Sequence, residues 1–156
     1  MKKMFMVIAA ISFPFIIKAQ PVNDLSGLSY DESGSPMNGT YITKYDNGSV
    51  KNEMQYVNGL KDGSFITYNA QGKIIEMGSY NKGLKDGKWT SWNNDGIKTG
   101  EVRFDLGQKD GKWQIWDSNG TLRYVMFYDN GNKTGTWQVY NEKGSMVEEK
   151  DYSIAF

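Results

Sequence analysis

The chain has 156 residues, enough for one domain, and its 18 glycines, 3 prolines and 14% aromatic residues are typical of a turn-rich β protein. It contains neither cysteine nor histidine, so it lacks the commonest low-pKa nucleophile, the commonest general base and the commonest transition-metal ligand. Disulfide bonds are excluded, and we expect no catalytic residue, no cofactor and no metal ion.

The first twenty residues have the pattern of a secretory signal peptide. Lys2 and Lys3 precede an apolar run over residues 4–17 that is too short to span a bilayer, and Ala19 is a small residue near the expected cleavage point. We therefore expect residues 1–20 to be cleaved and the protein to be exported to the periplasm, the cell surface or the medium. An uncleaved membrane anchor is the alternative.

Removal of this segment leaves 15 basic against 18 acidic residues. A nucleic-acid or anionic-membrane binder takes its affinity from an excess of clustered Lys and Arg. We therefore expect no nucleic-acid partner and no membrane association after cleavage.

Residues 21–37 form a lead-in with one short predicted strand over residues 27–30, and residues 38–156 carry a repeat. Glycines recur every 24 residues, at Gly39, Gly63, Gly87, Gly111 and Gly135. A fixed period of this size is typical of proteins that stack one small supersecondary unit several times. The spacing therefore predicts about five copies of one unit, the last of them truncated.

Each copy has the pattern of a β-hairpin. When the repeat glycine is counted as position zero, position two is always aromatic, position nine is always glycine and position seventeen is always Tyr or Phe. In three copies the second glycine follows Asn47, Asp95 or Asn119, and such a pair between aromatic-rich runs predicts a two-residue type I′ turn. The predicted fold is all-β: a single elongated, twisted antiparallel meander of about five stacked hairpins.

A turn centred on positions eight and nine assigns the side chains to two faces of the sheet. On the more apolar first face, position two lies opposite position fifteen, which predicts the cross-strand pairs Tyr41 with Met54, Phe65 with Gly78, Trp89 with Val102, and Trp113 with Met126. On the second face, position five lies opposite position twelve. This register predicts a cation-π pair between Arg123 and Trp116.

Position five of the second face is the best candidate for a ligand-binding surface. Its candidate residues are Tyr68, Trp92, Trp116 and Tyr140, together with Arg123. Aromatic side chains about 10 Å apart on a sheet suit a sugar chain or an extended peptide. The alternative is that curvature of the sheet buries these rings as a second packing face.

A column of lysines precedes the repeat glycines, at Lys61, Lys85, Lys109 and Lys133. The first three are each followed by an aspartate, which largely cancels their field, so we expect solvated loop lysines. The aspartates come one from each copy, about 10 Å apart, which is too far to share a metal ion or to act as a catalytic pair. We expect them to accept backbone N–H groups in turns.

The repeat pattern resembles a known family. In one copy it is carried by Gly111, Trp113, Trp116, Asn119, Gly120, Leu122, Tyr128 and Gly131. This pattern is similar to the MORN repeat variant of bacterial proteins that are often labelled as antitoxins of the YwqK type, and the resemblance covers residues 38–152. It implies consecutive antiparallel hairpins and a role in contact with other molecules. In one respect the chain departs from the classical repeat, because an aromatic such as Trp89 stands where that repeat has a second glycine.

Taken together, these features predict an exported, non-catalytic repeat protein that acts as a binding or scaffold module, with another protein as the first expected partner. The alternative partner is a cell-surface or cell-wall glycan bound through the aromatic face, because the pattern of aromatics and turns is similar to choline-binding and glucan-binding repeats. A hydrolytic enzyme is a third class, and it would require two acidic groups in one pocket, which the periodicity does not supply.

Overall fold

The structure, a computed structural model, describes residues 22–23 and 27–153. The predicted signal peptide, residues 1–20, lies outside the described residues. The strands are β1 (Val22–Asn23), β2 (Ser29–Tyr30), β3 (Gly39–Lys44), β4 (Val50–Val57), β5 (Leu60–Tyr68), β6 (Ile74–Asn81), β7 (Leu84–Trp92), β8 (Lys98–Asp105), β9 (Gln108–Lys109), β10 (Gly111–Trp116), β11 (Leu122–Asp129), β12 (Asn132–Tyr140) and β13 (Met146–Asp151). Among these residues there is no helix long and apolar enough to cross a membrane.

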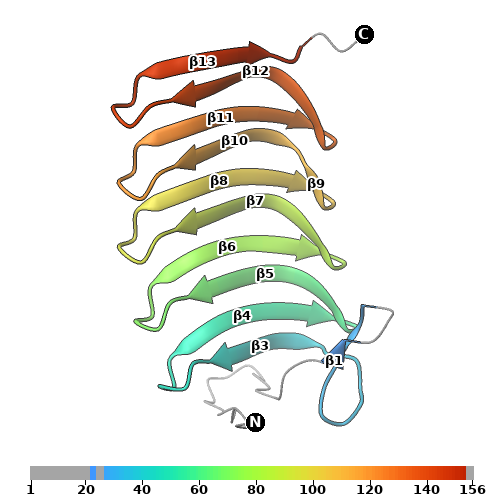
Figure 1. The fold of residues 1–156 in the computed structure, drawn as a ribbon. Helices are drawn as coiled ribbons and strands as arrows, with labels where there is room; N and C mark the ends of the chain where they lie inside the picture. The colour runs from blue at the N-terminus through green and yellow to red at the C-terminus, as the bar shows by residue number, and fades with distance from the viewer. Residues whose placement is uncertain (1–21, 24–26, 154–156) are drawn as a thin grey trace.

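One open antiparallel sheet contains all the strands from β3 to β13. Its order is β3-β4-β5-β6-β7-β8-β10-β11-β12-β13, with the short β9 paired to β8, so neighbours in the sheet are also neighbours in the sequence. Figure 1 shows the hairpins stacked one above another, with β3 and β13 at opposite ends of the stack. The predicted all-β meander of five hairpins is confirmed.

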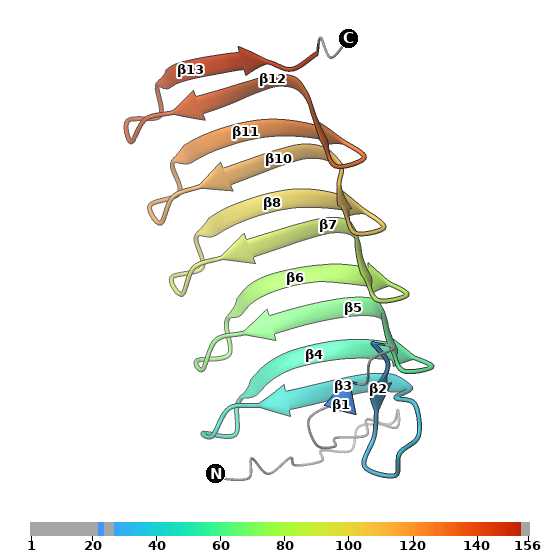
Figure 2. The ribbon, with the colours of Figure 1, turned by 45° about the vertical axis from the view of Figure 1, so that its right-hand side comes forward.

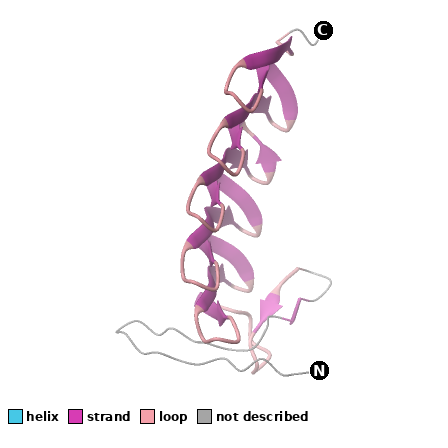
Figure 3. Cartoon of the chain, turned by 60° about the vertical axis from the view of Figure 1, so that its left-hand side comes forward, coloured by secondary structure: helices cyan, strands magenta, loops and turns pink. Residues whose placement is uncertain are grey.

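The sheet is a single layer along most of its length. The small β1-β2 pair lies beside the first hairpin, and the views in Figures 2 and 3 show no second layer of described residues over the later hairpins. A single sheet has no partner layer against which to bury its side chains. The core must therefore be built on the surface of the sheet itself.

Aromatic side chains of positions two and seventeen form this core as a ladder on the first face. From Phe65 to Tyr152, the centres of neighbouring rings along the ladder lie 4.9–6.4 Å apart. The indole N–H groups of Trp89, Trp113 and Trp137 donate to backbone carbonyls at 2.9–3.2 Å. Their indoles are thus held against the sheet, and Trp89 is only 2% exposed.

The predicted pairs between positions two and fifteen are all present in the register of the sheet. Phe65 lies opposite Gly78 as predicted, but the ring that covers this glycine belongs to Trp89 on the next strand. A Cβ built on Gly78 would lie 2.3 Å from Cδ2 of Trp89. The glycine therefore makes room for the most deeply buried indole.

The type I′ turns lie at the opposite end of the hairpins from the one predicted. They join consecutive hairpins, and both of their central residues have positive φ: Asn58-Gly59, Lys82-Gly83, Leu106-Gly107 and Asn130-Gly131. At positions eight and nine only the glycine has positive φ. The prediction of type I′ turns at Asn47, Asp95 and Asn119 is therefore wrong.

Three-residue loops close the hairpins at the end where the type I′ turns were predicted. In the third copy the Asn93 N–H donates to the Ile97 carbonyl at 2.9 Å, and the Gly96 N–H donates to the Asn93 carbonyl at 3.0 Å. The Asn93 side-chain oxygen also accepts the N–H groups of Asp95 and Ile97, both at 3.0 Å. This side chain favours the longer loop, which is a type I turn followed by a left-handed glycine.

The extra loop residue shifts the register on the second face. Position five pairs with position eleven, as Trp92 with Lys98 and Trp116 with Leu122, and position twelve is left unpaired in a bulge. The predicted pairing of positions five and twelve is therefore wrong. The hydrogen-bonded asparagine or aspartate that opens most of the loops is the cause.

The predicted loop lysines lie in strands and cover the aromatic ladder. The ammonium groups of Lys61, Lys85, Lys109 and Lys133 lie 3.7–5.2 Å from the centres of their nearest rings. Their prediction as loop residues is wrong, although Lys109 and Lys133 are solvent-exposed as expected. An irregularity beside the repeat glycine turns each lysine onto the first face. The prediction for the aspartates holds for Asp86, whose carboxylate accepts the Leu106 N–H at 3.3 Å.

The lead-in closes the ladder at its first hairpin. Met37 stands 24 residues before Lys61, at the same position of the repeat, and is 2% exposed in a cluster with Tyr41 and Tyr56. The Gly59 N–H donates to the Met37 carbonyl at 2.9 Å, as the later turn glycines do to the lysine carbonyls. An apolar residue thus replaces lysine where the end of the ladder is covered.

Candidate binding surface on the second face

The four position-five aromatics each end the first strand of a hairpin. Tyr68 ends β5, Trp92 ends β7, Trp116 ends β10 and Tyr140 ends β12. Side chains alternate along a strand, so these rings lie on the face opposite the ladder. All four are half-buried, neither sealed in a core nor fully exposed.

Side chains of position eleven fill the gaps between these rings. Each lies on the second strand of a hairpin, directly opposite its aromatic, and the set is Ile74, Lys98, Leu122 and Met146. Aromatic and position-eleven side chains thus alternate across the sheet. This alternating set of eight side chains is called the second-face row below.

The hydroxyl groups of the two tyrosines of the row are hydrogen-bonded. The Tyr68 hydroxyl donates to Glu53 Oε1 at 2.9 Å, and the Tyr140 hydroxyl donates to Gln138 Oε1 at 2.9 Å. Burial, followed by the bond to the Glu53 carboxylate, raises the pKa of Tyr68 above its ordinary value. The two tryptophans between them are the largest apolar side chains of the candidate surface.

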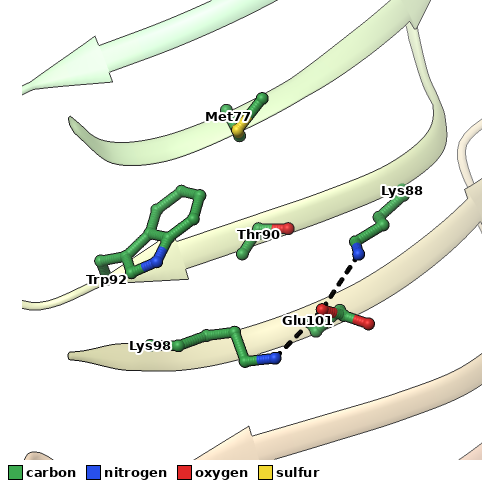
Figure 4. Close-up of a pocket in the computed structure, with 6 residues that line it drawn as sticks. All are labelled: Met77, Lys88, Thr90, Trp92, Lys98 and Glu101. Atoms are coloured by element: carbon green, nitrogen blue, oxygen red, sulfur yellow. Dashed lines mark hydrogen bonds and ion pairs between the residues drawn. The ribbon is translucent and has the colours of Figure 1, made fainter. Parts of the chain in front are cut away.

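An open depression of about 430 Å³ lies beside Trp92. Its lining residues are Met77, Lys88, Thr90, Trp92, Lys98 and Glu101, and Figure 4 shows them on three neighbouring strands. Met77 on the rim is 43% exposed, whereas Thr90 at the floor is 8% exposed. The depression therefore offers both an apolar wall and charged groups to a ligand.

Two lysines hold the one carboxylate of this depression. Lys88 Nζ lies 3.1 Å and Lys98 Nζ 3.2 Å from Glu101 Oε2. The hydrogen bonds from Lys88 and then Lys98 lower the pKa of Glu101 below its ordinary value. The carboxylate is thus charged near neutral pH, and the group of three carries a net positive charge.

Lys98, and not Arg123, is the cation over Trp116. The Lys98 ammonium lies 4.2 Å from the centre of the Trp116 ring. Arg123 occupies the bulge, where its Nε donates to the Tyr140 carbonyl at 2.9 Å and its Nη1 lies 3.6 Å from Asp117 Oδ2. The predicted pair of Arg123 and Trp116 is therefore wrong, because the bulge directs the guanidinium toward the loop of its hairpin.

Arg123 instead lines a second open depression, of about 420 Å³, with Asn141, Glu142 and Lys143 of the last loop. The structure therefore places Trp92 and Trp116 in one row with Lys98 between them, and Arg123 elsewhere. Among the described residues there is no group of three or more acidic side chains placed to hold a metal ion.

Sequence reasoning missed the basic residues of this surface. Lys88 and Lys112 occupy position one and Arg103 occupies position sixteen of the second face, and each is exposed. The signal was present in the comparison of copies, since position one is Thr or Ser in every other copy. The aromatic pattern, which recurs in all copies, drew the prediction away from the positions that differ.

The fold defines a class of protein: an open, single-layer antiparallel sheet built from repeated hairpins. Three segments of the chain, residues 37–58, 61–82 and 109–131, match the MORN repeat variant. They begin at the column of Met37, Lys61 and Lys109, so each match spans one unit of the repeat. No curated protein matches the chain. Repeats of this kind are generally associated with binding or scaffold roles.

Proposed function

We propose that the protein is exported, that it is not an enzyme, and that it acts as a binding or scaffold module whose second face contacts another protein. The observation that carries this proposal is the exposure of apolar side chains in and beside the second-face row. Met77 is 43% and Ile74 is 38% exposed next to Trp92, on a face that no other layer of described residues covers. Exposed apolar groups gathered in this way mark interaction surfaces.

The composition of the face favours a protein partner. Aromatic residues, Met and Arg are enriched at protein interfaces, and the second face combines Trp92, Trp116 and Met77 with exposed Arg103. Half-buried indoles lose little conformational entropy on binding. Export is supported by the signal-peptide pattern of residues 1–20.

A glycan is the second candidate partner, favoured by one observation. Trp92 and Trp116 stand in β7 and β10, two strands apart across β8, so their indoles are spaced about 10 Å from each other. Such spacing suits sugar rings along one chain. Retention of the protein on purified cell wall, lost in the Trp92→Ala and Trp116→Ala variants, would favour the glycan over a protein.

A photo-activated cross-linker placed on either face tests the proposed function. Met77 on the second face and Tyr124 on the first face are matched sites, since both side chains are large and both are 43% exposed. In cells that produce this protein, a cross-linker at position 77 should give a discrete adduct with one partner protein. The same group at position 124 should give none.

Two outcomes would contradict the proposal. Equal cross-linking from positions 77 and 124 would show non-specific contact, and the absence of adducts from position 77 would leave the second face without a protein partner. If the protein were then retained on purified cell wall, a glycan would be favoured as the partner.

A further inference from the structure

Four basic residues gather on the second face around the Trp92 depression. Lys88 in β7 lies directly opposite Arg103 in β8. Lys112 stands two residues before Gln114, which pairs with Glu101. Lys112 therefore continues the line of Lys88 and Arg103 onto β10. With Lys98 at the depression itself, the cluster spans three neighbouring strands of the sheet.

The cluster has an excess of positive charge. Two carboxylates contact it: Glu101, held by Lys88 and Lys98, and Asp110, whose Oδ2 lies 3.4 Å from Arg103 Nε. Lys88 and Arg103 remain widely exposed, at 63% and 60% of their side chains. The chain as a whole has 18 basic and 18 acidic residues, so this surplus is local.

The repeat fold does not require these charges. The first, second and fifth copies build the same hairpin with Thr or Ser at position one, and every copy except the third, which has Lys98, has an apolar residue at position eleven. Like charges directly opposite each other in a sheet are destabilising, yet Lys88 faces Arg103. Glu101 and Asp110 offset only two of the four positive charges of the cluster, so a net positive charge remains for a ligand to neutralise.

We infer that this cluster, with Trp92 and Met77, binds an acidic segment of a partner protein in which carboxylates flank an apolar side chain. This inference rests on the proposed function and names the chemistry of the partner. Lys88, Arg103 and Lys112 pair with the carboxylates, while the apolar side chain enters the depression against the indole and the methionine.

The apolar neighbours decide between a protein and other anionic polymers. A uronate chain or a nucleic acid carries negative charge and flat rings that stack on Trp92. Neither carries flexible aliphatic groups that would cover Met77 and Ile74, which are 43% and 38% exposed. A protein segment supplies both kinds of group.

The five tryptophan indoles make the test internally controlled. The indole N–H groups of Trp89, Trp113 and Trp137 are hydrogen-bonded on the first face, whereas Trp92 and Trp116 lie on the second face. The ¹⁵N-labelled full chain is titrated with a synthetic peptide in which glutamates flank leucine and phenylalanine. We expect the indole signals of Trp92 and Trp116 to move while the other three stay in place.

Matched probes and variants give the chemistry of the interaction. The same peptide with glutamine in place of glutamate should bind at least tenfold more weakly. The K88E/K112E double variant should lose the response, and the K51E/K143E variant, which changes the net charge equally at exposed lysines elsewhere, should keep it. Two-dimensional spectra of both variants show directly whether they are folded.

Three outcomes would overturn the inference: no movement of the Trp92 and Trp116 signals, equal movement with the glutamine peptide, or a stronger response to an oligogalacturonate or to single-stranded DNA. The glutamine comparison uses only the wild-type chain, so it stands even if a variant fails to fold. A specific cross-link from position 77 combined with a failed titration would reject the acidic partner but retain the binding function.

Discussion

The Lys85 ammonium lies 3.7 Å from the centre of the Trp89 ring, and that ring is 2% exposed although no second layer of described residues covers the sheet. The long lysine stem takes the place of the missing layer, because its methylene groups shield the ring while its charge stays in contact with water. The same arrangement recurs with Lys109 over Trp113 and with Lys133 over Trp137. The first face is therefore a finished core rather than an open ligand surface.

Truncation of this lysine should destabilise the protein. Lys85→Ala removes both the cation-π contact and the stem, and we expect the free energy of unfolding to fall by about 1–2 kcal/mol. Lys85→Met keeps the stem, as Met37 does at the same position of the repeat, and should lose less than half of that. Urea denaturation of the three proteins measures both losses. If Lys85→Ala were as stable as the wild type, lysine would not cover the ladder.

Gly78 should tolerate no side chain. A Cβ at this position would lie 2.3 Å from Cδ2 of the Trp89 ring, which is packed on all sides, so Gly78→Ala should cost about 1–3 kcal/mol through overpacking. Gly100 is the matched control, since it is also a strand glycine with ordinary φ, but its closest neighbour is the rotatable Ser91 Oγ at 2.5 Å. Thermal unfolding should show a clear loss for Gly78→Ala and little change for Gly100→Ala; equal losses would contradict this.

Leu106 occupies a strained turn position that the other copies fill mostly with asparagine. Its φ is +43°, in the left-handed region, where Asn58 and Asn130 stand at the equivalent sites. A leucine in this region costs about 1 kcal/mol, so Leu106→Asn should raise the free energy of unfolding by about 0.5–1 kcal/mol. Leu84→Asn, at a leucine of similar exposure in an ordinary strand, should not. A stabilising Leu84→Asn would instead indicate a general effect of removing exposed leucine.

The period of the sequence was sufficient to predict the fold and the register of the first face. Glycine and aromatic positions recur without exception, so pairs such as Trp89 with Val102 follow from counting. The turns were assigned to the wrong end because Asp95-Gly96 has the composition of a type I′ turn, while the side chain that decides the loop belongs to Asn93, two residues earlier. One residue of loop length then displaced Arg123 from the row.

The candidate site was predictable in its aromatic part only. The second-face row contains Tyr68, Trp92, Trp116 and Tyr140 as expected, but position eleven lies between them because of the bulge. The lysine column was misassigned for another reason. Its sequence neighbours are turn residues and charges, and contact with a ring on another strand is a property of the assembled sheet that spacing along the chain does not reveal.

Glu101 should contribute to stability only above mildly acidic pH. Hydrogen bonds from Lys88 and Lys98 lower its pKa in the folded protein below the ordinary value of 4.5. A group with a lowered folded pKa stabilises the protein above its unfolded pKa, and that stability is lost as the pH falls through the folded value. Near neutral pH, the free energy of unfolding of the wild type should exceed that of Glu101→Gln by less than about 1 kcal/mol, because the lysines are exposed.

That difference should shrink as the pH falls below 4.5. Glu142→Gln, at an exposed carboxylate in the last loop, is the control and should follow the wild type throughout. Urea denaturation at several pH values measures the three curves. A difference between wild type and Glu101→Gln that persisted unchanged into strong acid would show that its cause is not the charge.

Deletion of residues 87–110 should leave a folded protein with one hairpin fewer. The residues Lys-Asp-Gly-Lys-Trp at 85–89 recur identically at 109–113, so joining Asp86 to Gly111 reproduces a junction that the chain already contains. Each hairpin contacts only its neighbours in the sheet, and in such arrays stability is close to a sum of unit and nearest-neighbour terms. The shortened protein should unfold cooperatively with a smaller m-value, because less surface is exposed on unfolding.

The deletion also separates the architecture from the binding surface. It removes Trp92, Lys98 and Arg103 together, so the shortened protein should keep its β-sheet circular dichroism while losing the response to the acidic peptide. Deletion of residues 39–62, two periods upstream, removes no residue of the depression or of the basic cluster and should retain both. A shortened protein that is unfolded under native conditions would mean that the hairpins depend on contacts beyond their neighbours, and the nearest-neighbour description of this sheet would be wrong.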